Sequence, residues 1–144
     1  YASRGSIVTP TINAADDSLF GYIHHGYDGT QYVQSSYIVA GIDSQASVGV
    51  GAMPGNILLG TTPDNGSTVN SVVINKDGNL GVNTLTPSKK LVVNGNAQVV
   101  NELLLGNMDE TARDALTPAN GMVIYNTTAN KFQGYENGAW ANLI

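Results

Sequence analysis

The strongest constraint on the fold is the shortness of the strands predicted between residues 71 and 100. In SVVINKDGNLGVNTLTPSKKLVVNGNAQVV, small apolar residues alternate with polar ones, and turn residues interrupt them every few positions. Burying a few Val and Leu side chains at about 1.5–3 kcal/mol each does not offset the roughly 1–2 kcal/mol of conformational entropy lost per ordered residue. We therefore expect the narrow apolar stripe to be covered by other copies of the same chain, wound around a common axis.

The turns within this stretch follow from residues that accept positive φ angles. Asp77-Gly78 and Asn94-Gly95 predict tight hairpin turns, and Pro87 predicts a break before the apolar run that begins at Leu91. INKDGNLG has a faint likeness to a calcium loop, but it lacks the regular series of oxygen ligands and the closing Glu. We interpret it as a plain hairpin turn.

Upstream residues also predict antiparallel strands. The segments GYIHHGYDG, QYVQSSYIVAGID and ASVGVGA place β-branched and aromatic residues at period two between residues 21 and 52. Asp28-Gly29 predicts the turn between the first two of these strands.

The last forty residues predict a short helix followed by a three-stranded meander. GNMDETARDALTPANG carries an apolar stripe at helical spacing, Asn107 or Asp109 can cap its start, and Thr117-Pro118 ends it after two turns. The meander is predicted at 122–126, 131–136 and 139–143. One apolar face on three strands is barely enough for independent stability, so this segment too is expected to share its core with other copies.

Composition excludes several functional classes. Charged residues make up 12% of the chain, the net charge is −5 and the pI is about 4.6, so no basic face is available for nucleic acid. No apolar run approaches the roughly 20 residues that cross a bilayer, so membrane insertion is not expected. The chain has no cysteine and no glycine-rich loop opening a helix, and we expect no cofactor. It begins with Tyr1, which indicates a mature product or a piece of a longer chain.

Acidic and histidine residues raise two chemical alternatives. Asp16-Asp17 and Glu136 can be drawn as the acid and base of a glycosidase, but adjacent carboxylates favour a solvated turn, and we expect no catalysis. His24 and His25 lie next to each other on a predicted strand, so only one of them can face a trimer axis and bind an ion there. A surface histidine without metal is the favoured alternative.

The aromatic and amide residues predict where a receptor could bind. Sugars are held by stacking on aromatic faces and by fixed hydrogen-bond partners. The terminal meander offers both types of residue at Tyr135, Trp140, Asn130, Gln133 and Asn137. Alternatively, Trp140, Tyr125 and Phe132 form a hydrophobic plug that holds three copies together.

A second candidate receptor patch lies further upstream. Tyr27 and Tyr32 flank the predicted GYDGT turn. Alternatively, these two rings serve packing and do not bind a receptor.

Several motifs, taken in order, resemble a module of bacteriophage tail fibres. They are the SRGS opening, the GYDGT turn, MPGNILLGTTPDNGSTV, INKDGNLGVNTLTPSKKLVVNG and the ending TPANGMVIYNTTANKFQGYENGAWANL. The fibre pattern closes on a GNVGIGTTNP-type string, from which this chain departs at Asn83 and Leu85. The resemblance spans nearly the whole chain and identifies architecture better than ligand.

The resemblance implies an all-β, elongated, intertwined homotrimeric fibre of short strands and hairpins, with one short helix before a C-terminal three-stranded β-meander. Its predicted parts are an N-terminal β module at 1–70, an intertwined β neck at 71–101 and a helix-plus-meander cap at 102–144. The implied function is that of an extracellular virion component, a tail fibre tip that binds a host cell-surface glycan or outer-membrane receptor without catalysis. A purely structural fibre segment and a fragment of a polysaccharide depolymerase are the alternatives.

Overall fold

The computed structural model describes residues 4–5, 10–64, 66 and 69–143. Contacts group the chain into two units, residues 1–97 and 98–144. The described elements are strands apart from one short helix, which confirms the all-β prediction. No helix among the described residues has the length and apolarity needed to cross a membrane. The three predicted parts of the chain stay a prediction, and the SRGS and TTPDNGSTV motifs fall partly outside the described residues.

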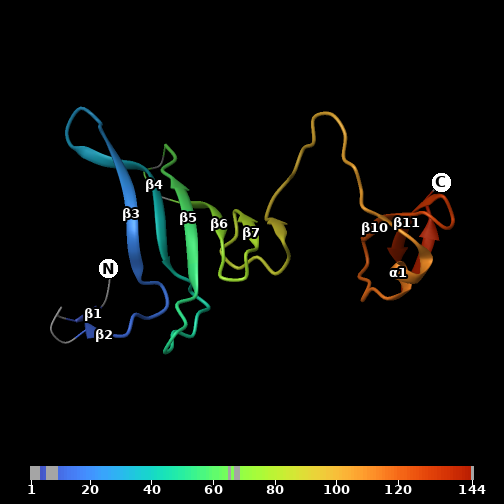
Figure 1. Ribbon diagram of the computed structural model, residues 1–144. Coiled ribbons are helices and arrows are strands. Elements are labelled where there is room, and N and C mark those ends of the chain that lie inside the picture. Colours follow the sequence, from blue (N-terminus) through green and yellow to red (C-terminus); the bar gives the residue numbers. More distant parts are fainter. Residues whose placement is uncertain (1–3, 6–9, 65, 67–68, 144) are drawn as a thin grey trace. The chain divides into compact units, whose positions relative to one another are not determined.

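A six-stranded sheet dominates the first unit (Figure 1). Its strands follow one another in chain order: β3 (Ser18–Tyr27), β4 (Tyr32–Ile42), β5 (Gly55–Thr61), β6 (Val69–Ile74), β7 (Leu80–Val82) and β8 (Leu91–Val93). Neighbouring strands are antiparallel except β7 and β8, which are parallel. Two short strands, β1 (Arg4–Gly5) and β2 (Pro10–Thr11), form a separate antiparallel pair. The sheet confirms the predicted antiparallel pairing of β3 with β4.

Side-chain amides fold the stretch from β6 to β8. Asn75 Oδ1 accepts hydrogen bonds from the backbone N–H groups of Asp77 (3.1 Å) and Asn79 (2.9 Å), and Gly78 has a φ of 68°. The predicted hairpin turn at this position is confirmed. Asn79 Nδ2 also donates to the Pro87 carbonyl (3.0 Å), which ties the loop before β8 back to the turn.

The end of this stretch differs from the prediction. Asn94-Gly95 does not form a hairpin, because β8 is followed by irregular chain and pairs with β7 in parallel. Asn94 instead exchanges two side chain–backbone hydrogen bonds with Asn83, at 3.0 and 3.1 Å. Asn83 has a φ of 55°, a conformation that Gly and Asn both adopt, so this departure from the fibre pattern is conformationally neutral. ASVGVGA is also not a strand: it forms a turn closed by one bridge between Gly49 and Ala52.

The second unit is a four-stranded sheet with one helix. It contains β9 (Asn107–Met108), α1 (Glu110–Asp114), β10 (Val123–Asn126), β11 (Lys131–Glu136) and β12 (Ala139–Asn142), with sheet order β12-β11-β10-β9. The predicted antiparallel meander is confirmed, and Asp109 caps α1 through a bond from Ala112 N–H to Asp109 Oδ1 (2.8 Å). The helix is shorter than predicted, because Met108 belongs to β9, which pairs in parallel with β10.

Candidate self-association and receptor-binding surfaces

One face of the six-stranded sheet is apolar and uncovered. Paired residues lie on the same face of a sheet, so the register places one set of side chains together. We call this set the apolar face: Phe20, Tyr22, Ile38, Ile57, Leu59, Ile74, Leu80 and Leu91. Every member is exposed, from 36% at Leu80 to 61% at Phe20 and Tyr22. The six strands contain no Asp, Glu, Lys or Arg. A contiguous surface of this kind is typical of an interaction site.

Side chains pack closely on part of the opposite face of the same sheet. The Tyr37 ring lies over Gly60, where a Cβ would overlap it, and burial raises the pKa of the Tyr37 phenol. Gly81 lies against Val73 and the Thr84 carbonyl, and Val73 is only 1% exposed. The buried hydrophobic residues of the described chain are Ile42, Val73 and Ile124. Local packing thus closes part of the opposite face, around Gly60 and Val73, whereas Ile23 on that face is 54% exposed and the apolar face is left open.

The second unit covers one of its faces with a hydrogen-bonded amide network. Asn126 is fully buried and donates from Nδ2 to Gln133 Oε1 (3.0 Å). The same oxygen accepts from Arg113 Nη1 of α1 (3.1 Å), and Gln133 Nε2 donates to Asn142 Oδ1 (2.9 Å). Bonding to Asp114, with further charge attraction from Asp114 and Glu110, raises the pKa of the Arg113 guanidinium. We call Arg113, Asn126, Gln133 and Asn142 the amide network, which joins the helix to the sheet.

The aromatic residues of the second unit divide between its two faces. Tyr125 pairs with Phe132 and Tyr135 pairs with Trp140, with ring centroids 5.1 and 5.2 Å apart. Phe132 and Tyr135 are three residues apart on one strand, so the two pairs face opposite sides. Within one chain Trp140 therefore lies on the other side of the sheet from Tyr125 and Phe132, and a plug of these residues that holds three copies together stays a prediction. The face with Phe132 also carries the half-exposed Val123 and Leu143.

The receptor residues predicted in the meander do not form one site. Asn130 and Asn137 occupy turns before and after β11, with φ angles of 52° and 51°, and a rise of about 3.3 Å per residue separates them by about 20 Å. Gln133 is 6% exposed and its amide belongs to the amide network. Tyr135 lines an open, mainly apolar hollow of about 190 Å³ with Met122 and Leu143. Only Asn137, Tyr135 and Trp140, among these, lie toward the same end of the sheet.

The other predicted patch, at Tyr27 and Tyr32, is exposed. Tyr27 and Tyr32 pair across the end of the β3–β4 hairpin, with ring centroids 5.4 Å apart and planes tilted by 56°. Their exposures are 62% and 75%. We call these two residues and the turn 28–31 between them the tyrosine tip.

The two histidines face opposite sides of β3, as strand alternation predicts. His24 Nδ1 lies 3.1 Å from Ser36 Oγ, on the same side as the apolar face, and His25 pairs with Gln34 on the other side. Among the described residues, no three His, Asp or Glu side chains of one chain gather where they could hold a metal. An axial ion shared by three copies stays a prediction, and of the two histidines His24 is the one on the side of the apolar face.

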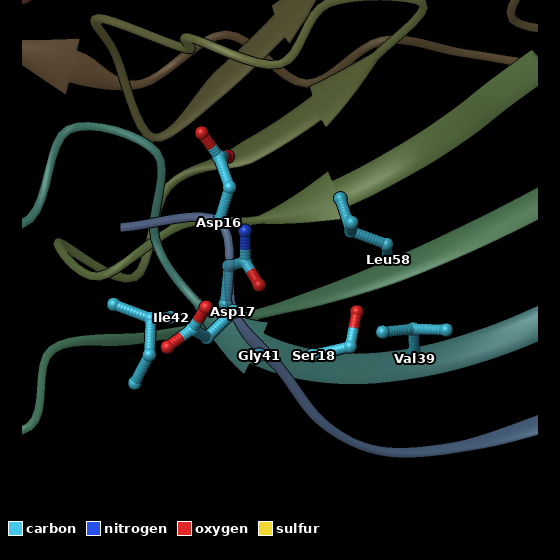
Figure 2. Close-up of a pocket in the computed structure, with 8 residues that line it drawn as sticks. Asp16, Asp17, Ser18, Val39, Gly41, Ile42 and Leu58 are labelled. Carbon is cyan, nitrogen blue, oxygen red and sulfur yellow. The ribbon is translucent and has the colours of Figure 1, made fainter. Parts of the chain in front are cut away.

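Asp16 and Asp17 line a small pocket at the end of β4. Figure 2 shows the Asp17 carboxylate beside Ile42 and the Asp16 carboxylate pointing away from it. Asp17 Oδ2 accepts from Ala14 N–H (2.8 Å), and the Asp17 carbonyl accepts from Ile42 N–H (2.7 Å). The pocket measures about 40 Å³, which is room for about one water molecule and not for a sugar ring.

A family comparison identifies the end of the chain. Residues 81–144 match the model of a family described as a phage tail like trimerisation region. The match supports a phage tail fibre-type protein, a virion component that self-associates into a homotrimer, and it confirms the resemblance at this level. No curated protein matches the chain.

The trimerisation region and the apolar face overlap. Leu91 lies within the matched residues and continues the face, whose other members lie upstream of residue 81. The sequence shows the alternation that builds this face, but the pairing of six strands that assembles it had no sequence signal of its own.

Proposed function

We propose that this chain is the tip of an extracellular tail fibre that attaches a virion to the bacterial surface by binding a surface glycan, without catalysis. The match of residues 81–144 to a phage tail like trimerisation region is the observation that carries the proposal. Virion attachment from a fibre uses weak sites repeated by three in each trimer, which gives avidity without tight single sites.

The scaffold of this tip is three copies joined through the apolar face. Burying that face removes exposed apolar side chains from water at about 25 cal/mol per Å², and no charged group in β3 to β8 opposes it. The remaining surface, including the turns, then faces the solvent. This arrangement suits recognition of a receptor by loops on a rigid framework.

Two observations support a binding role over catalysis. Asp16 and Asp17 form a turn beside a pocket of about 40 Å³, and the larger hollow of the second unit is open and mainly apolar. Sites that enclose small-molecule substrates usually measure about 300–1,000 Å³. The low charge of the chain suits a neutral glycan held by stacking and hydrogen bonds.

A structural fibre segment without receptor binding is the second candidate, because the matched family is defined by trimerisation. The two are separated by adding the purified, fluorescently labelled chain to whole cells of a bacterial strain panel and by measuring phage adsorption in its presence. Binding to some strains, with blocked adsorption on them, supports attachment. A trimer that neither binds nor blocks on any strain assigns the chain to the spacer role.

The alternative that the chain is part of a depolymerase is tested with the same purified chain. Incubation of the chain with capsule or lipopolysaccharide from the bound strains is expected to release no reducing ends. Release of reducing ends overturns the non-catalytic proposal.

A further inference from the structure

The β3–β4 hairpin extends beyond the rest of its sheet. β5 pairs with residues 36–42 of β4, so residues 32–34 have β3 as their only neighbouring strand among the described residues. Figure 1 shows this two-stranded ribbon running past the end of β5 to its turn. Both sides of the ribbon are open, and the tyrosine tip forms its end.

A β-bulge turns the tyrosine tip away from the apolar face. His24 pairs with Ser36 but His25 pairs with Gln34, which leaves Ser35 as an extra residue in β4. Without that residue, alternation would place Tyr32 and Gln34 on the same face as Ile38. The bulge instead places Tyr32 beside Tyr27, and Gln34 beside His25, on the opposite face. If copies cover the apolar face, these four side chains remain exposed.

Local hydrogen bonds hold the turn between the two rings. Asp28 Oδ1 accepts from the N–H groups of Thr30 and Gln31, both at 2.8 Å, and Asp28 N–H donates to the Gln31 carbonyl (3.0 Å). These bonds, with that from Gln31 contributing most, lower the pKa of the Asp28 carboxyl. Gly29 has a φ of 99°, which favours glycine. The other oxygen of the Asp28 carboxylate makes no hydrogen bond with the described residues and stays available as an acceptor.

We propose that the tyrosine tip is the glycan-binding site of this chain, and that it takes a neutral sugar ring. The two tilted rings offer an angled aromatic surface for the C–H face of a pyranose. His25 and Gln34 lie on the same face of the ribbon and add hydrogen-bonding groups, and Asp28 follows Tyr27 in the turn. The inference rests on the proposed function, since it names the site by which the fibre tip would hold its receptor.

The geometry favours this site over the terminal meander. In the meander, Gln133 is held in the amide network, Asn130 and Asn137 serve turns at opposite ends of β11, and Tyr135 and Trp140 are partly buried against each other. At the tyrosine tip, both rings are more than half exposed. The tip also lies outside residues 81–144, so binding there leaves the trimerisation region free to perform its own role.

The test compares variants of the full chain for binding to purified capsular and O-antigen polysaccharides from strains whose cells bind the wild type. Replacing both rings, Tyr27→Ala with Tyr32→Ala, is expected to weaken binding by about tenfold or more, because exposed aromatic anchors carry a large share of such affinity. Tyr27→Phe with Tyr32→Phe keeps the stacking surface and is expected to stay within about twofold. Sedimentation must show that the association state of each variant equals that of the wild type.

Tyr135→Ala is the matched control in the other candidate patch, and it is expected to bind as the wild type does. If the double Ala variant binds as the wild type does, the tyrosine tip is not the binding site. If Tyr135→Ala loses polysaccharide binding instead, the site lies in the meander, and the proposal that the chain binds a glycan still stands. A second test treats the cells before binding is measured. If protease treatment removes binding and periodate treatment does not, the receptor is a protein, and the proposal of a glycan is overturned. A wild-type chain that binds no cells and no polysaccharide contradicts the proposed function itself.

Discussion

The two sheets of this chain differ in how their apolar residues are covered. The four-stranded sheet of residues 98–144 covers one face with α1, joined through the amide network, and buries Ile124 and Asn126. The six-stranded sheet has more strands but buries, among described hydrophobic residues, only Ile42 and Val73. A helix and a satisfied polar network close a small sheet from within, whereas a sheet built of β-branched stripes needs a second apolar surface. We expect trimerisation to supply that surface.

The largest effect is expected from a charge on the apolar face. Ile38→Asp introduces a carboxylate that is half exposed in one chain but buried without a partner between copies, so we expect the association constant to fall by about a hundredfold or more. Ile23→Asp is the matched control, because Ile23 is similarly exposed but lies on the opposite face. Sedimentation velocity of both variants measures the effect. Equal loss in both would show that the face does not matter.

A smaller effect is expected from breaking the amide network in the other unit. Gln133→Ala leaves the buried Asn126 amide, and also Arg113 and Asn142, without their partner, which should lower the free energy of unfolding by about 2–3 kcal/mol. Fluorescence of Trp140, the single Trp of the chain, reports unfolding of this unit. Thr127→Ala, at an exposed turn position, should leave the midpoint unchanged at the same chain concentration. A Gln133→Ala midpoint equal to that of the wild type would mean that the network does not close this sheet.

A comparable or slightly smaller loss of stability is expected from a substitution on the packed face of the first sheet. In Gly81→Ala the new Cβ overlaps the Thr84 carbonyl oxygen and lies 2.9 Å from Val73 Cγ1, which should cost about 1–3 kcal/mol. Gly26→Ala places its Cβ in open space and serves as the control. Urea midpoints followed by circular dichroism compare the two variants. Equal midpoints would contradict the close packing described for this face.

The smallest effect concerns the pH dependence of the tyrosine tip. Its turn is held by hydrogen bonds to the ionised Asp28 carboxylate, whose pKa is lowered chiefly by the bond from Gln31. The resulting stabilisation is complete above the ordinary Asp pKa and is lost as the pH falls through the lowered folded value. An NMR titration should show the Asp28 pKa below its ordinary value, with the Thr30 and Gln31 amide signals following it. An Asp28 pKa at or above the ordinary value would show that these hydrogen bonds do not stabilise the turn.

Residues with local consequences were predictable from the sequence. Asp28-Gly29 and Asp77-Gly78 form the expected turns, the meander has the expected pairing, and Asp109 caps the helix. Each depends on side chains and backbone angles within a few residues of one another.

Features set by pairing between distant segments were not predictable. The bulge at Ser35 depends on how β4 registers against β3, and it reverses the face on which Tyr32 lies. The parallel pairing of β8 with β7 replaced the hairpin expected at Asn94-Gly95. Gln133 resembles a ligand-binding amide in the sequence, and only its bonds with Arg113, Asn126 and Asn142 assign it to the structure of the unit.

The mass of the chain in solution tests the central claim most directly. Sedimentation equilibrium over a wide dilution range should give a species of three times the 15.0 kDa chain mass, because the apolar face must be covered by copies. A stable, folded monomer would contradict this, since it would mean that the apolar face remains in water without a partner.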